Sequence, residues 1–205
     1  MQVAELQEKR TILQRRITKW CQIQSFYMPG VGDLRGRYDV SEGEVSHPEN
    51  LLLYLPSGCR AEYHLSEALV DMEKRLRLAQ AEDTLAELRR LLRVKLGLWD
   101  YKFSQLGPSQ RANTRARSII SRFEDKIGRC AERYRAARLA LTKLDATGSW
   151  SQRFLELKPE HVKSPGRGND DESEGRREIS WIWMMKVDGG EVNASVSEEE
   201  IGNSK

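Results

Sequence analysis

The sequence predicts an all-α protein: an elongated antiparallel helical hairpin, similar to a coiled coil, with an additional N-terminal helix and disordered segments. Two long stretches repeat apolar residues at alternating spacings of four and three, which keeps those residues on one side of an α-helix. A short break containing Gly and Pro separates the stretches, so the two helices are expected to pack as an antiparallel pair. Gly-, Ser- and acid-rich segments near the C-terminus lack this periodicity, which predicts disorder.

The first predicted helix spans residues 3–28. Its apolar face consists of Leu6, Leu13, Ile17 and Trp20. Pro29 and Gly30 end it, because proline disfavours the helical conformation of the residue before it. Residues 30–50 contain Gly, Asp, Ser and Glu without periodicity, which predicts a loop. The stretch 48–57 is apolar and bracketed by prolines, so we expect a turn or extended piece against the helices.

The second predicted helix spans residues 64–106, with Ser66 as its N-cap. The first part of its apolar stripe consists of Leu65, Leu69, Met72, Leu76 and Ala79. The stripe then drifts to Ala81, Leu85, Leu88 and Leu92, and onward to Trp99 and Phe103. A helix of this length extends about 60 Å and needs a partner along it. Gly107 and Pro108 end the pattern.

The third predicted helix spans residues 113–145 and has the most regular apolar stripe in the chain. We call this stripe the seam; it consists of Ala116, Ile120, Phe123, Ile127, Cys130, Tyr134, Ala137, Leu141 and Leu144. Its spacing is typical of a helix that lies along another helix over roughly four heptads. We therefore expect Phe123 and Ile127 to be buried.

Residues 1–157 form the predicted helical domain. It closes with a packing cluster of Trp150, Phe154 and Leu157. A linker over 158–178 and an apolar segment over 179–187 follow, and residues 188–205 form a disordered acidic tail. In the apolar segment Ile179, Trp181 and Trp183 alternate as on a strand. The two tryptophans are expected either to pack back onto the hairpin or to remain a partly exposed adhesive surface.

The composition excludes several classes of protein. The chain has 205 residues, and it shows neither a secretion signal nor an apolar run long enough to cross a membrane, which predicts a nuclear or cytoplasmic protein. Its three cysteines and three histidines lack the short regular spacings of metal ligands, so no metal or other cofactor is expected. Three acids at helical spacing, Glu82, Asp83 and Glu87, are interpreted as a solvated helix face. We predict no enzymatic activity and no small-molecule substrate.

Positive charge is concentrated in the third helix. Residues 111–145 hold ten Lys or Arg against four Asp or Glu, whereas residues 168–205 hold four against ten. We call five cations on one side of the helix the basic row: Arg115, Arg122, Lys126, Arg129 and Arg133. Cations arranged in this way contact phosphates without sequence preference. The alternative is that they pair with neighbouring acids or lie in solvent.

Four phrases resemble the region downstream of the catalytic core in fungal Kyakuja-Dileera-Zisupton (KDZ) transposases and their associated cysteine-cluster proteins. They are LQEKRTILQRRITKWCQIQSFYMPGV, EKRLRLAQAEDTLAELRRLLR, NTRARSIISRFEDKIGRCAERYRAARLALTKLD and GRREISWIW, and they span most of residues 6–183 in the family's order. The resemblance implies a mostly helical region of a mobile-element protein. No counterpart of the family's catalytic carboxylates or cysteine clusters can be placed on the sequence. A further long helix follows the last phrase in the resembling proteins, so we expect a detached or degenerate piece.

The sequence therefore predicts a non-catalytic accessory fragment of a KDZ transposase-like protein that mediates protein–protein or protein–DNA contacts. In the protein-interaction hypothesis, the seam and its flanks bind another helix, from a partner protein or a second copy. In the alternative hypothesis, the basic row binds the phosphate backbone of DNA. Salt separates the two, because phosphate binding weakens steeply with ionic strength and apolar docking does not.

Overall fold

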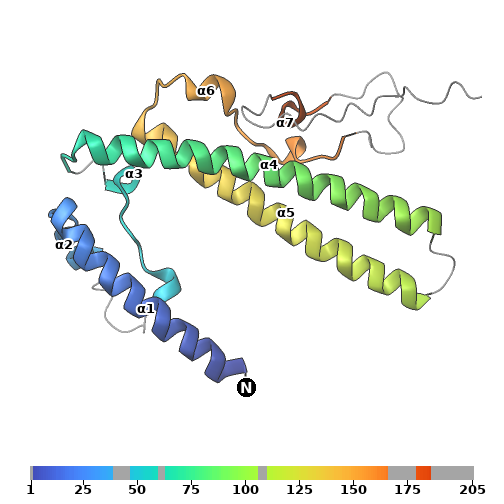
Figure 1. The fold of residues 1–205 in the computed structure, drawn as a ribbon, viewed down its shortest axis with the longest axis horizontal. Helices are drawn as coiled ribbons and strands as arrows, with labels where there is room; N and C mark the ends of the chain where they lie inside the picture. Colours follow the sequence, from blue (N-terminus) through green and yellow to red (C-terminus); the bar gives the residue numbers. More distant parts are fainter. Residues whose placement is uncertain (1, 39–46, 60–62, 106–109, 166–178, 186–205) are drawn as a thin grey trace, which may run out of the picture.

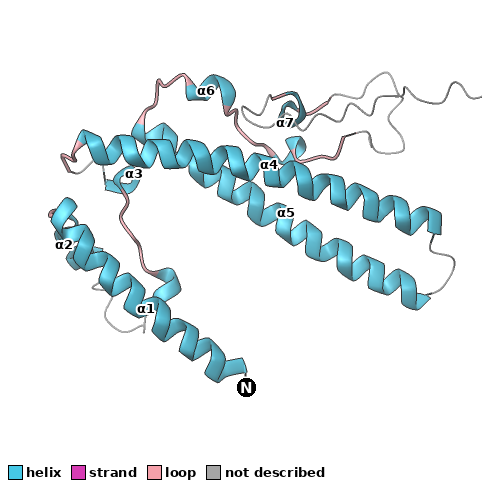
Figure 2. Cartoon of the chain, in the orientation of Figure 1, coloured by secondary structure: helices cyan, strands magenta, loops and turns pink. Residues whose placement is uncertain are grey.

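The computed structural model describes residues 2–38, 47–59, 63–105, 110–165 and 179–185. Within these ranges all regular structure is helical and no strand is present (Figure 2). The predicted all-α fold with a long helical hairpin is confirmed. The predicted acidic tail and most of the predicted linker, residues 166–178, lie outside the described residues.

The hairpin of α4 (Glu67–Gln105) and α5 (Gln110–Leu144) forms the body of the molecule (Figure 1). The two helices run side by side in opposite directions, with the predicted break between them outside the described residues. The sequence placed these helices at 64–106 and 113–145. On the α4 side, the core between the helices consists of Ala81, Leu85, Leu88, Leu91 and Leu92.

The drift of the α4 stripe marks two different faces of one helix. α4 begins directly after Ser66, whose carbonyl oxygen accepts hydrogen bonds from the N–H groups of Leu69 and Val70 at 3.0 and 3.2 Å. The later apolar residues, from Ala81 onward, face α5 and are buried. Of the earlier set, Met72 and Leu76 are instead exposed, on a side of the helix that α5 does not cover.

The N-terminal arm consists of α1 (Gln2–Tyr27) and α2 (Val31–Tyr38). The prediction of a loop over 30–50 is wrong for α2. Two glycines in this stretch suggest a loop, but Val31 and Leu34 supply an apolar edge that is fully buried, and tertiary packing outweighs the weak local propensity. These two side chains join a second core, which attaches the arm to the end of the hairpin. Its other members are Met28, Cys59, Leu65, Val70 and Leu144.

A connecting segment joins the arm to α4. It contains the 3₁₀ turn η1 (Pro48–Asn50), extended residues 51–55, and the single-turn helix α3 (Pro56–Cys59), which contacts both α4 and α5. Tyr54 adopts a positive φ of 47°, a left-handed conformation that directs the chain from the extended stretch toward α3. The expectation of a turn or extended piece describes this segment well.

The chain after α5 folds back along the hairpin through α6 (Trp150–Arg153), η2 (Pro159–His161) and α7 (Trp181–Met184) (Figure 1). Trp150, Phe154 and Leu157 are buried in the core of the hairpin. The strand-like interpretation of the apolar segment is wrong, because Trp181–Met184 forms one helical turn on α4. Ile182 is fully buried, and Trp181 and Trp183 are half-buried against the hairpin core.

Candidate protein-interaction groove

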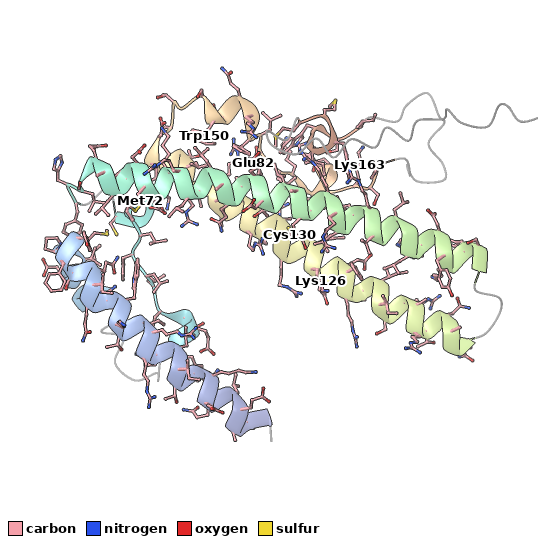
Figure 3. The ribbon with its side chains drawn as sticks, in the orientation of Figure 1. Met72, Glu82, Lys126, Cys130, Trp150 and Lys163 are labelled. Carbon is pink, nitrogen blue, oxygen red and sulfur yellow. The ribbon has the colours of Figure 1, made fainter. Side chains whose placement is uncertain are left out.

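The seam of α5 lies against α4. Seven of its nine residues are buried, and Ala116 and Phe123 are half-buried. Cys130 points into the contact between α4 and α5, and its thiol donates to the Thr84 carbonyl oxygen at 3.2 Å (Figure 3). Because α4 of the same chain covers the seam, the protein-interaction hypothesis requires a binding surface elsewhere on the chain.

The seam also holds the segment that follows α5. The Tyr134 hydroxyl donates to the Leu155 carbonyl oxygen at 2.7 Å, and Arg135 Nε donates to that of Leu157 at 2.9 Å. Burial raises the pKa of the Tyr134 phenol and the pKa of the Cys130 thiol above their ordinary values. A thiol of this kind stays protonated and behaves as a small apolar side chain, so the seam has a packing role.

The basic row lies exposed along α5. None of its five cations forms an ion pair within 4.0 Å with another residue that the structure describes. Lys126, one turn from Cys130 (Figure 3), places its Nζ 5.1 Å from the centre of the Phe123 ring. Hydrogen bonding by Arg90 lowers the pKa of Glu87, and attraction from Arg133 and Lys126 adds to this, so Glu87 partly balances two cations of the row.

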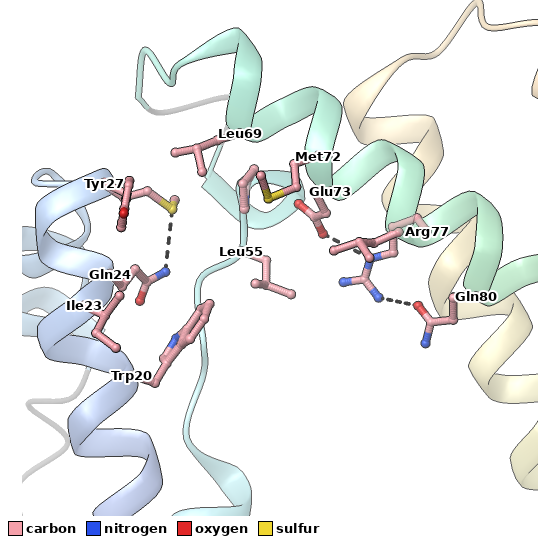
Figure 4. Close-up of a pocket in the computed structure, with 13 residues that line it drawn as sticks. Trp20, Ile23, Gln24, Tyr27, Leu55, Leu69, Met72, Glu73, Arg77 and Gln80 are labelled. Atoms are coloured by element: carbon pink, nitrogen blue, oxygen red, sulfur yellow. Dashed lines mark hydrogen bonds and ion pairs between the residues drawn. The ribbon is translucent and has the colours of Figure 1, made fainter.

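A groove opens between α1 and α4, on the side of α4 that α5 leaves uncovered (Figure 4). Its cavity measures about 570 Å³. One wall comes from α1, the other from α4, and Leu55 and Pro56 of the connecting segment lie between them. The apolar wall residues are Trp20, Ile23, Tyr27, Met28, Leu69, Met72 and Leu76.

Polar contacts of the connecting segment set the distance between the walls. On the α1 side, Gln24 Nε2 donates to the carbonyl oxygens of Leu53 and Tyr54 at 3.0 and 2.7 Å. On the α4 side, the buried Glu73 carboxylate accepts the N–H of Ser57 at 2.7 Å and its hydroxyl at 2.8 Å. Arg77 Nε also donates to Glu73 at 3.0 Å. These polar groups are hydrogen-bonded within the chain and hold the two walls in place. This favours a groove that is already formed before a partner binds.

Five of the seven apolar wall side chains are exposed to solvent. Trp20 is 40% exposed, Met72 51%, and Tyr27 and Leu76 each 66%. These side chains come from two helices and face one cavity, so they form one continuous apolar surface. Adjacent apolar side chains from separate elements typically mark a binding site for another molecule. The lining offers shape and apolar area for binding.

Four of the apolar wall side chains belong to the stripes predicted from sequence, which assigned none of them to a binding surface: Trp20, Leu69, Met72 and Leu76. Ile23, Tyr27 and Met28 were missed. The available signal was the drift in α4, because a stripe that changes face within one helix indicates two different contacts. Which element packs against each face of α4 depends on how the N-terminal arm docks onto the hairpin. The spacing of residues within one helix does not specify that docking.

The acids of α4 are used structurally. Glu82 pairs with Arg153 at 2.6 Å, and Glu87 pairs with Arg90 at 2.8 Å. No cluster of three or more metal-ligating side chains occurs among the described residues. Across the same ranges, every helix is too short or too polar to span a bilayer. Comparisons with protein-family models, curated proteins and solved structures gave no significant match.

Proposed function

We propose that this chain is a non-catalytic protein-interaction module, and that the groove between α1 and α4 binds an apolar segment of a partner protein. The observation that carries the proposal is the groove itself: about 570 Å³ of open space lined mainly by apolar side chains of two helices. A surface of this kind is costly to leave in water, and its coverage by a partner supplies the driving force for association.

An amphipathic helix is the form of partner segment that best suits this groove. On α4 the wall residues Leu69, Met72 and Leu76 recur at spacings of three and four, and on α1 Trp20, Ile23 and Tyr27 do the same. Side chains at these spacings accept the knobs of a third helix that lies between them. The partner helix would extend the hairpin into a larger helical assembly.

We further propose that the chain is an accessory region of a KDZ transposase-like mobile-element protein and that it acts inside the cell. The support for this proposal is the sequence resemblance across residues 6–183. A helical module with an open apolar groove suits a region that recruits another protein rather than one that performs the reaction.

The test uses a fluorescein-labelled peptide of about three heptads, with Leu at the core positions and Gln at the flanking positions. Fluorescence anisotropy should report saturable binding to the full chain. Leu76→Asp should weaken binding at least about tenfold, because a charge then enters the apolar contact. The matched control is Leu139→Asp on α5, since Leu139 is 58% exposed and lies outside the groove lining. Equal binding by wild type and Leu76→Asp would contradict the proposal.

DNA binding by the basic row is the second candidate function, favoured by the exposure of all five cations on one helix. If the row binds phosphates, changing Arg122, Arg129 and Arg133 to Gln should abolish retention of duplex DNA without loss of helical content. Binding should also weaken steeply between low and physiological salt. A wild-type chain that shows no retention on duplex DNA at low salt would remove this candidate.

A further inference from the structure

We propose that the groove selects an amphipathic helix that carries acidic residues along the flank facing α1. This inference rests on the proposed function and specifies the chemistry of its partner. The relevant observation is the distribution of charge on the two walls, which is strongly one-sided.

The wall formed by α1 is bordered mainly by positive charge. From Lys9 to Gly32 the chain carries five Lys or Arg and no acid, and the first two of these cations pair with Glu5 and Glu49. Arg16 lies four residues before Trp20, and Lys19 lies four residues before Ile23, so both cations continue the groove-facing rows of α1. Both side chains are exposed, and neither forms an ion pair with another residue in the described part of the chain.

The cations of the α4 wall, by contrast, have acidic partners. Arg75 pairs with Asp71 at 3.4 Å, and Arg77 pairs with Glu73 at 3.0 Å. Lys74, further around the helix, forms an ion pair with Asp145. A bound helix therefore meets a balanced wall on α4 and an unbalanced positive wall on α1. Acidic side chains on the flank toward α1 would complement that charge.

The same charge distribution argues against a second copy of α1 as the occupant. A helix packed against α1 in the groove would bring its own flanking residues close to Arg16 and Lys19. If that helix were another α1, like charges would lie together, which is unfavourable at a helix–helix contact. An acidic partner removes this repulsion, so the structure favours a different protein over self-association.

The experiment compares two further peptides with the same Leu core, one with Glu and one with Lys at the flanking positions. Each is titrated against the full chain by fluorescence anisotropy at low and at high salt. We expect the Glu peptide to bind about tenfold more tightly than the Lys peptide at low salt, with the difference largely lost near 1 M salt. Arg16→Glu combined with Lys19→Glu should reverse the preference. The matched control, Arg117→Glu combined with Lys143→Glu at exposed positions of α5, should leave it unchanged.

The outcomes separate the inference from the function on which it rests. Equal affinity for the Glu and Lys peptides, with binding still lost in Leu76→Asp, would overturn the charge selection and leave the groove as a binding site. If the Arg16→Glu/Lys19→Glu variant still prefers the Glu peptide, the preference arises outside α1, and this result also overturns the inference. Failure of every peptide to bind would contradict both. Light scattering that shows a dimer through the groove, disrupted by Leu76→Asp, would assign the groove to a second copy.

Discussion

The seam of α5 and the apolar stripe of α1 have similar spacings but opposite environments. Along α5, every seam residue from Ile127 to Leu144 is buried. Along α1, Leu6, Leu13 and Trp20 are 48%, 36% and 40% exposed. Periodic apolar residues therefore define a face that requires a partner, and the fold decides whether the chain itself supplies that partner. In this protein the uncovered face borders the groove.

The reason for the difference lies in connectivity. A short break returns the chain from α4 to α5, so the seam of α5 meets the later part of the α4 stripe, from Ala81 to Leu92. α1 is held at its C-terminal end by Met28 in the second core and along its side by the connecting segment, where Arg10 pairs with Glu49 at 2.6 Å. These contacts leave Trp20, Ile23 and Tyr27 exposed, and these three side chains line the groove.

The largest effect should come from a charge placed in the seam. Ile127→Asp should cost at least about 3 kcal/mol of unfolding free energy, because an unpaired carboxylate would enter an apolar contact. Urea denaturation followed by circular dichroism measures this cost. Leu139→Asp, on the same helix but exposed, should change the unfolding free energy by less than about 0.5 kcal/mol. A loss below about 1 kcal/mol for Ile127→Asp would show that the seam is not the main core.

A smaller loss is expected where the C-terminal segment is held on α4. Arg89 donates to the carbonyl oxygens of Ile182 and Met185, and Trp181 Nε1 donates to His161 Nδ1 at 3.0 Å. Arg89→Leu should cost about 1–3 kcal/mol, because two partly buried carbonyls lose their donor.

The same variant should increase iodide quenching of tryptophan fluorescence as Trp181 and Trp183 become accessible. Arg90→Leu is the control, since Arg90 is exposed and its guanidinium hydrogen-bonds to Glu87 on the same helix. Quenching that stays at the wild-type level in Arg89→Leu would contradict the docking of Trp181–Met184 on α4.

Alkaline pH should weaken the seam. Burial raises the pKa of Tyr134 above its ordinary value of 10.0 and that of Cys130 above 9.0. Above these ordinary values the unfolded chain loses protons that the folded chain retains, so the unfolding free energy should fall as pH rises. The slope is at most about 1.4 kcal/mol per pH unit for each group. Urea denaturation across this range should show a shallower slope for Tyr134→Phe; an unchanged slope would contradict the burial of its hydroxyl.

The smallest stability effect is expected in the groove. Leu76→Asp should alter the unfolding free energy by less than about 0.5 kcal/mol, because Leu76 is 66% exposed in the free chain. Thermal denaturation of wild type and variant measures this directly. A large loss of unfolding free energy would mean that the groove is part of the core, which would contradict its role in binding a partner.

The hairpin could be predicted from sequence because its contacts lie between neighbouring helices with regular stripes. α2 could not, since Gly32 and Gly36 weaken helix propensity and only the distant packing of Val31 and Leu34 compensates. The turn at Trp181–Met184 was missed for a similar reason. Its alternation of Ile and Trp fits a strand, but Arg89 donates to the Ile182 carbonyl oxygen and Trp181 donates to His161, and these distant contacts favour a helical turn. The groove depends on the placement of α1, which no local pattern specifies.

The most direct test of the groove as a binding surface is hydrogen–deuterium exchange of the full chain with and without the Glu-flanked peptide. We expect slower amide exchange in the groove-forming turns of α1, around Trp20 to Tyr27, and of α4, around Leu69 to Gln80. Exchange along the basic row of α5 should remain unchanged. Protection along Arg115 to Arg133 in place of the groove, or saturating peptide with no protection in α1 and α4, would contradict the groove as the binding surface.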